Sequence, residues 1–142
     1  MFATLLINIV LVAAVVMIHF EMLNRLSRHC PVLAPIKARH RVVISVFIAL
    51  FAHVIEIWLF GLAYYWMIAE GSLGSLAGNY HHSIMDSVYY SFTSFTTLGF
   101  GDIEPTGAIR FVTGMEALTG LVLITWTASF IFIEMQRYWK DT

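Results

Sequence analysis

Charged residues are scarce in this sequence. Of its 142 residues, 12% are charged, whereas 59% are apolar and 15% are aromatic. Soluble domains carry about 25% charged residues, so the composition disfavours a soluble enzyme. The formal net charge is only −1, which excludes a strongly basic nucleic-acid-binding protein, because no large positive field would hold phosphates. Cys30 is the only cysteine, so an internal disulfide is excluded as well.

The sequence has long apolar blocks instead. Residues 1–20 carry no formal charge, and twenty helical residues rise about 30 Å, the thickness of the hydrocarbon core of a bilayer. This block lacks the basic start and the small-residue cleavage site of a signal peptide. Two further blocks span residues 42–69 and 106–135. Because backbone groups in lipid must be paired internally, we predict an all-α membrane protein with three transmembrane helices in a lipid bilayer.

The basic residues are divided unevenly among the connections between these blocks. A loop predicted at 21–41 and a tail at 137–142 hold all but one of them, and the segment between the second and third blocks holds only Arg110. Basic residues favour the cytoplasmic side of a membrane. We therefore expect a multi-pass protein of the cell membrane with its N-terminus outside and its C-terminus in the cytoplasm. The residues on the predicted cytoplasmic side are Arg25, Arg28, Lys37, Arg39, Arg41, Arg137 and Lys140.

The segment between the second and third blocks begins as a loop and continues as a short helix. Residues 70–82 are rich in glycine and serine and are typical of an extracellular loop. Ser83 and Asp86 have the spacing of a capping box, which predicts a helix over 83–95. This helix is too short to cross a bilayer. It either enters the membrane and stops, as a re-entrant helix, or lies in the headgroup layer.

The residues that follow, TTLGFGD at 96–102, favour the re-entrant helix. If consecutive carbonyl oxygens are to face one axis and replace the water around a cation, the backbone must alternate between right-handed and left-handed dihedral angles. Left-handed angles are costly for residues with a Cβ but not for glycine, so Gly99 and Gly101 suit this alternation. Thr97 adds a hydroxyl oxygen. The motif therefore predicts a cation-selective filter over 97–102.

Over residues 42–136 the sequence resembles the pore module of potassium channels, whose filter sequence is TVGYG. The resemblance implies passive conduction of potassium ions, without a cofactor and without enzymatic activity. It implies an outer helix, a pore helix, a filter and an inner helix, at 42–69, 83–95, 97–102 and 106–135. It places Gly101 at the outer mouth and four residues around the ions, namely Thr97, Leu98, Gly99 and Phe100.

The resemblance also implies residues that support or gate the filter. Asp102 would lie behind the mouth, and Thr96, the first residue of the motif, is expected to support the filter with it. Tyr90 matches an aromatic residue of the pore helix that often hydrogen-bonds this aspartate in the family. Gly120 falls near the hinge of the inner helix. Phe132 shares a face of that helix with Ile124 and Ala128, and we take it as a candidate for narrowing the inner mouth.

Three positions depart from the usual pattern of the family. Leu98 replaces valine, which matters little because only its carbonyl is used. Phe100 replaces tyrosine and so removes a hydroxyl that tethers the filter, and Thr93 stands where some bacterial channels place a glutamate. Some potassium-selective relatives also carry phenylalanine in the filter. We therefore expect potassium selectivity with a less rigid filter.

The chain supplies only one such loop, whereas a ring of carbonyls around an ion needs about four. A homotetramer with cyclic symmetry is therefore the expected assembly. Beyond its own copies and the lipid, the sequence indicates no soluble partner and no nucleic acid.

Ionisable residues within the apolar blocks suggest a second site. His53 and Glu56 share one face of the second block, and counting residues from the span ends places Glu56 and Glu116 within about 5 Å in depth. We expect a buried network of His53, Glu56 and Glu116, which serves as a structural contact, a pH-sensitive element or a metal site. His19, near the predicted end of the first helix, is expected at the membrane interface.

Three alternatives to a potassium channel remain open. The first is a weakly selective monovalent cation channel, suggested by Leu98 and Phe100. The second, of a different class, is an intramembrane metal-binding enzyme that uses His53, Glu56 and Glu116. The third is a non-conducting subunit of a larger channel.

Overall fold

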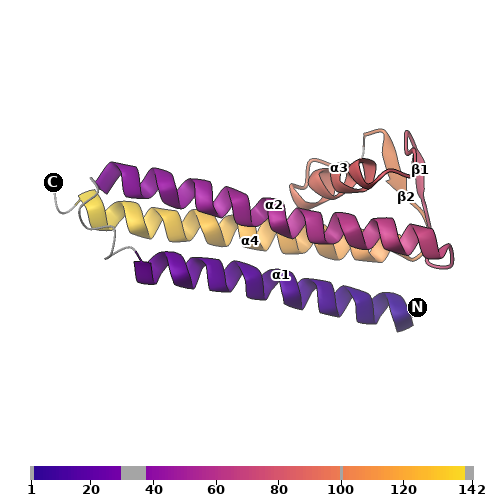
Figure 1. The fold of residues 1–142 in the computed structure, drawn as a ribbon, viewed down its shortest axis with the longest axis horizontal. Coiled ribbons are helices and arrows are strands. Elements are labelled where there is room, and N and C mark those ends of the chain that lie inside the picture. Colours follow the sequence, from indigo (N-terminus) through magenta and orange to yellow (C-terminus); the bar gives the residue numbers. More distant parts are fainter. Residues whose placement is uncertain (1, 30–37, 100, 140–142) are drawn as a thin grey trace.

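Three long helices form most of the molecule. The computed structural model describes residues 2–29, 38–99 and 101–139. The helices α1 (Phe2–His29), α2 (Ala38–Glu70) and α4 (Ile109–Trp139) run side by side along its long axis (Figure 1). Between α2 and α4 the chain forms β1 (Leu76–Gly78), α3 (Ile84–Phe95) and β2 (Ile103–Pro105). These short elements gather at the end of the bundle where α1 begins (Figure 1).

All three long helices are long and apolar enough to cross a membrane. The qualifying segments are Phe2–Arg28, His40–Glu70 and Ile109–Gln136. Large apolar side chains on their outer faces are exposed in the single chain, for example Phe47 and Phe51 at 67% each. Such continuous apolar surfaces are typical of faces that contact lipid or other subunits.

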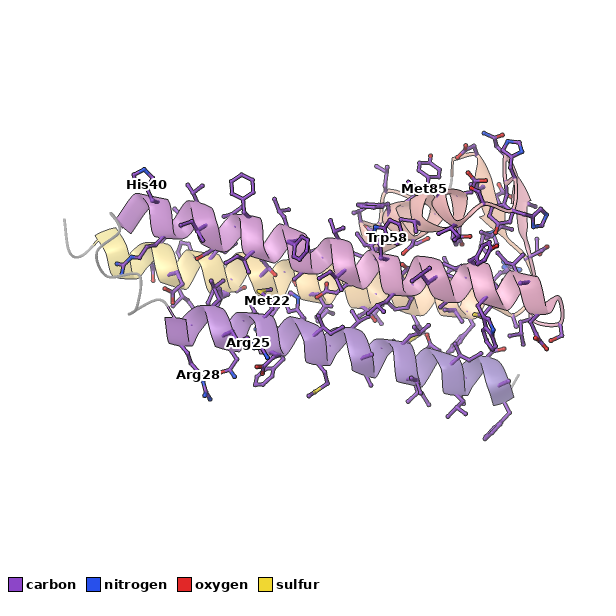
Figure 2. All side chains as sticks on the ribbon, in the orientation of Figure 1. Met22, Arg25, Arg28, His40, Trp58 and Met85 are labelled. Atoms are coloured by element: carbon purple, nitrogen blue, oxygen red, sulfur yellow. The ribbon has the colours of Figure 1, made fainter. Side chains whose placement is uncertain are left out.

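The helices that flank the predicted loop at 21–41 extend further than expected. The helix α1 continues to His29 and α2 begins at Ala38. Side-chain pairs one turn apart support the added turns: Arg25 Nε donates to Glu21 Oε1 at 2.7 Å, and Arg28 Nε donates to Asn24 Oδ1 at 3.1 Å. Both arginines point away from the other helices (Figure 2).

Several predicted features of this loop and of the tail, including Cys30, Lys37 and Lys140, lie outside the described residues.

The helix α3 begins with the capping pair that its sequence predicts. Ser83 is the N-cap, and its Oγ accepts a hydrogen bond from the backbone N–H of Asp86 at 2.9 Å. The Asp86 carboxylate accepts one from the backbone N–H of His81 at 2.8 Å. This backbone hydrogen bond holds the pKa of Asp86 below its ordinary value. The start of α3 is thereby anchored to the loop before it.

A two-stranded sheet, which the sequence did not predict, joins the segments on either side of α3. The strands β1 and β2 pair antiparallel, with Leu76 opposite Pro105 and Gly78 opposite Ile103. Gly78 has a φ of 95°, and a Cβ there would run into the backbone carbonyl of Asp102, so only glycine fits. The pairing extends to Thr106, whose N–H donates to the Ser75 carbonyl at 2.8 Å. For this reason α4 begins at Ile109 rather than at 106.

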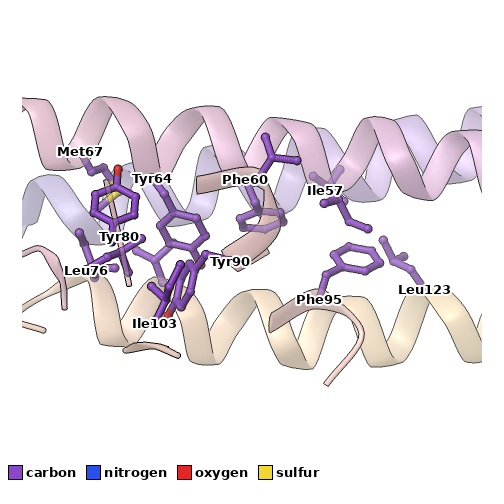
Figure 3. Packing of buried hydrophobic residues seen from close by; sticks show 14 residues of the cluster. Ile57, Phe60, Tyr64, Met67, Leu76, Tyr80, Tyr90, Phe95, Ile103 and Leu123 are labelled. Carbon is purple, nitrogen blue, oxygen red and sulfur yellow. The ribbon is translucent and has the colours of Figure 1, made fainter. Parts of the chain in front are cut away.

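The core of the molecule holds α3 against α2 and α4. Phe60 and Tyr64 of α2 and Tyr90 and Phe95 of α3 are fully buried. Phe95 lies near Ile57 of α2 and Leu123 of α4 (Figure 3). The short helix and the residues that follow it are therefore positioned by packing on two long helices.

Candidate functional site

The chain turns back on itself directly after α3. The N–H of Thr97 donates to the Ser94 carbonyl at 3.0 Å, and the N–H of Gly99 donates to the Thr93 carbonyl at 3.2 Å. Residues 96–99 are exposed, and Leu98 is 81% exposed. Three of the predicted ion-binding residues therefore lie on one short exposed segment that is hydrogen-bonded to the last turn of α3.

The backbone of this segment alternates in handedness. Thr97 has a φ of 58° and Gly99 a φ of 95°, whereas Leu98 between them does not have a positive φ. A positive φ is uncommon for a residue with a Cβ, so Thr97 holds a costly conformation. No atom lies within 4 Å of a Cβ built on Gly99. Glycine is required at this position by its dihedral angle and not by space.

The other two predicted ion-binding positions are less fully described. Phe100 lies outside the described residues. Gly101 is exposed, with open space around a built Cβ.

Asp102 is held by a different tyrosine from the one predicted. The hydroxyl of Tyr89 donates to Asp102 Oδ1 at 3.2 Å, and Asn79 Nδ2 donates to Oδ2 at 3.4 Å. Tyr90, the expected partner, instead pairs with Thr113 Oγ1 of α4 at 2.8 Å. The next residue of a helix points about 100° away, so Tyr90 faces the core while Tyr89 faces Asp102. The hydrogen bond to Asp102 raises the pKa of Tyr89.

This contact predicts the effect of removing the Asp102 charge. In the Asp102→Asn variant the pKa of Tyr89 is expected to fall toward the usual tyrosine value of about 10, because no carboxylate then opposes the phenolate. Ultraviolet pH titration measures the pKa of Tyr89 in the wild type and in Asp102→Asn. Subtracting the titration curve of each protein with Tyr89→Phe added isolates this residue from the other tyrosines. If the titration of Tyr90, isolated in the same way with Tyr90→Phe, shifted instead, the assignment of Tyr89 would be wrong.

Thr96 closes α3. It is the C-cap of the helix, and its Oγ1 donates to the Phe92 carbonyl at 2.6 Å. This contact ties Thr96 to the last turn of α3, and its role in supporting a filter stays a prediction.

Glu116 joins α3 to both neighbouring helices. It is fully buried. Tyr64 of α2 donates to its Oε2, and Ser91 of α3 donates to its Oε1, both at 2.5 Å. The Ser91 hydroxyl is also 2.8 Å from the Ile57 carbonyl of α2. These contacts fix the position and rotation of α3, and so of the segment after it.

The predicted network of His53, Glu56 and Glu116 is divided between two places. Glu56 Oε2 pairs with His53 Nδ1, but its Oε1 pairs with His19 Nδ1, both at 2.9 Å. Glu116 meets Tyr64, which lies two turns along α2 from Glu56. The predicted depth of Glu116 depends on a helix that starts at residue 106, whereas α4 starts at Ile109. The alternative of a metal-binding enzyme required His53, Glu56 and Glu116 together. It therefore lacks Glu116 as a third ligand.

His19 is a site residue that the sequence interpretation missed. It is fully buried within the chain, and α1 runs nine residues beyond the predicted end at residue 20. A signal was present in the sequence, since His19 is the only ionisable side chain in the first block. An ionisable group within an apolar span suggests a buried partner.

Gly120 lies where α4 meets the end of α3. A Cβ at Gly120 would run into the backbone carbonyl of Phe95, so the glycine permits a close approach of the two helices. The helix α4 continues through this position. Phe132 is 56% exposed in the single chain. A hinge at Gly120 and a gate at Phe132 stay predictions.

Comparison with known proteins agrees with this architecture. A protein-family model described as "Ion channel" matches residues 40–137, which include nearly all of α2 and α4, both strands and α3. No curated protein and no solved structure matches the chain. Because the family match covers more than half of the chain, and three helices are long and apolar enough to cross a membrane, this multi-pass membrane protein belongs to the ion channel family.

Proposed function

We propose that the protein is a potassium-selective channel, in which main-chain carbonyls of residues 97–101 line the ion path at the axis of a homotetramer. The observation that supports this proposal best is the alternation of φ at Thr97, Leu98 and Gly99. A run of alternating dihedral angles turns successive carbonyls to the same side, and such carbonyls replace the hydration shell of potassium.

The placement of this segment supports the same proposal. The helix α3 ends at Phe95, directly before it, so the negative end of the helix dipole points toward the segment and favours a cation there. The contacts of Glu116 and Tyr90 hold α3 against α2 and α4. A filter needs such a rigid support, because its oxygens must keep their positions as ions pass.

A tetramer follows from the number of carbonyls that one chain supplies. One segment gives one side of a carbonyl ring, and about four are needed. The exposed Leu98 and the cavity of about 390 Å³ between the segment and the first half of α4 lie on the surface that a neighbouring copy would cover. In this arrangement the N-terminal end of α1, α3 and the strands face the outside.

Reconstituted channels test the proposal. Purified protein in planar bilayers, with a potassium gradient opposed by sodium, is expected to give a reversal potential close to the potassium equilibrium potential. Native mass spectrometry is expected to give four chains per particle. A reversal potential near zero under opposed potassium and sodium would instead indicate a weakly selective cation channel. A monomer without conductance would overturn the proposed assembly.

A further inference from the structure

A second polar cluster lies between α1, α2 and α4 and takes no part in the proposed filter. His19 and Glu56 are fully buried, and the side chain of His53 is 13% exposed. Each imidazole Nδ1 is 2.9 Å from a different oxygen of Glu56. Each Nε2 is 3.2 Å from the same atom, Oγ1 of Thr127. Two rings from different helices thus share one carboxylate and one hydroxyl.

The hydrogen count of this cluster does not balance when both histidines are neutral and Glu56 is ionised. The carboxylate of Glu56 accepts from both Nδ1 atoms, so each ring carries its hydrogen there and presents only a lone pair at Nε2. The hydroxyl of Thr127 has one hydrogen and can satisfy only one of these two lone pairs. Buried polar atoms are normally all paired, so in that state the cluster needs one further positive charge, which a proton or a metal cation supplies.

A metal cation at the Nδ1 atoms removes this imbalance. With the cation in place of the two Nδ1 hydrogens, each ring carries its hydrogen on Nε2. Both Nε2–H groups then donate to Thr127 Oγ1, which has two lone pairs to accept them. A ligating histidine whose second ring nitrogen donates to an oxygen is the usual outer-shell arrangement of protein metal sites.

We propose that His19, His53 and Glu56 bind one divalent transition-metal ion of the zinc class. Their ligand atoms lie within 4.8 Å of one another. Zinc prefers imidazole nitrogens and carboxylate oxygens at roughly 2.0–2.2 Å, so binding requires the three side chains to close around the ion. Zinc with three such ligands keeps a fourth position for solvent. His53 and Thr127 line an apolar groove of about 630 Å³ between α2, α3 and α4, which supplies that position and a route for the ion.

The ion would fasten α1 to the rest of the protein. His19 belongs to α1, which lies outside the family match at 40–137, whereas His53 and Glu56 belong to α2. The site therefore links the additional helix to the ion-channel part of the chain. This inference does not rest on the filter, so it can fail while the proposed conduction path stands.

Metal titration of the purified full chain in detergent tests the proposal. After treatment with a chelator, the protein is expected to bind one Zn²⁺ per chain and to melt several degrees higher with zinc than without. Co²⁺ in the same site is expected to show the visible absorption of tetrahedral coordination. His19→Gln is expected to lose this binding, whereas a matched control, H81N/H82N in the exposed loop before α3, is expected to keep it.

Thr127 provides a variant that keeps all three ligands. Thr127→Val is expected to bind Zn²⁺ about 10- to 100-fold more weakly, as is typical when an outer-shell partner is lost, and Thr127→Ser is expected to restore the affinity. The proposal would be overturned by wild-type protein that binds no stoichiometric zinc, by equal affinity in His19→Gln, or by loss of binding only in H81N/H82N. An unchanged affinity in Thr127→Val would count against it as well.

Discussion

Replacing Gly99 with alanine is expected to reduce potassium flux through the reconstituted protein by more than 100-fold. Gly99 has a φ of 95°, and a built Cβ meets no atom of its own chain, so within the chain the added methyl group acts only on the backbone. A left-handed conformation costs a residue with a Cβ about 1–2 kcal/mol. In the proposed tetramer the cost at four such positions adds up to about 4–8 kcal/mol. Every 1.4 kcal/mol lowers the population of the conducting conformation about tenfold. Relaxation of this strain would turn carbonyls away from the axis.

A glycine outside the proposed filter controls for the backbone effect. Gly71 has a φ of 75° and nothing within 4 Å of a built Cβ, so Gly71→Ala introduces a similar strain in the loop after α2. Flux from liposomes loaded with potassium is expected to survive in Gly71→Ala and to be lost in Gly99→Ala. Undiminished potassium flux in Gly99→Ala would show that this carbonyl segment does not carry the ions.

Replacing Gly120 with alanine is expected to destabilise the folded protein by about 1–3 kcal/mol, the usual cost of overpacking. The new Cβ would meet the backbone carbonyl of Phe95, which cannot rotate away as a side chain could. The end of α3 would have to move, and the segment at Thr96 and Thr97 would move with it. Thermal unfolding in detergent measures the stability, and potassium flux measures the effect on the segment.

The same helix contains a matched control for this change. No atom lies within 4 Å of a Cβ built on Gly114 of α4, and alanine is the better helix former by about 0.8–1.0 kcal/mol. The two substitutions, identical in chemistry, are therefore expected to shift the melting temperature in opposite directions. A similar shift in both variants would mean that Gly120 is not a point of close contact.

The long elements could be predicted from the sequence, because each depends on a strong local signal. Three apolar blocks produced three helices, and the capping pair at Ser83 and Asp86 is present. Helix ends were less predictable. Glu21 and Arg25 fall within the loop predicted at 21–41, yet a charged pair one turn apart also stabilises a helix.

Contacts between segments distant in the chain were the part that the sequence could not predict. A one-residue difference decides whether Tyr89 or Tyr90 reaches Asp102, and only the rotation of α3 on its neighbours determines it. The strands β1 and β2 have three residues each, too few for an alternating pattern. Predicting the contact between His19 and Glu56 requires the position of α1 along the axis of α2. The composition of the two helices does not determine this position.

The short ladder between β1 and β2 has a consequence for assembly. It brings Gly78 and Ile103 together, so each chain joins the two ends of the stretch that contains α3 and the proposed filter without help from another copy. The conformational entropy of ordering that segment is then lost during folding of the single chain. Association of the proposed tetramer would unite four preorganised surfaces, and preorganisation of this kind leaves more of the contact energy available for affinity.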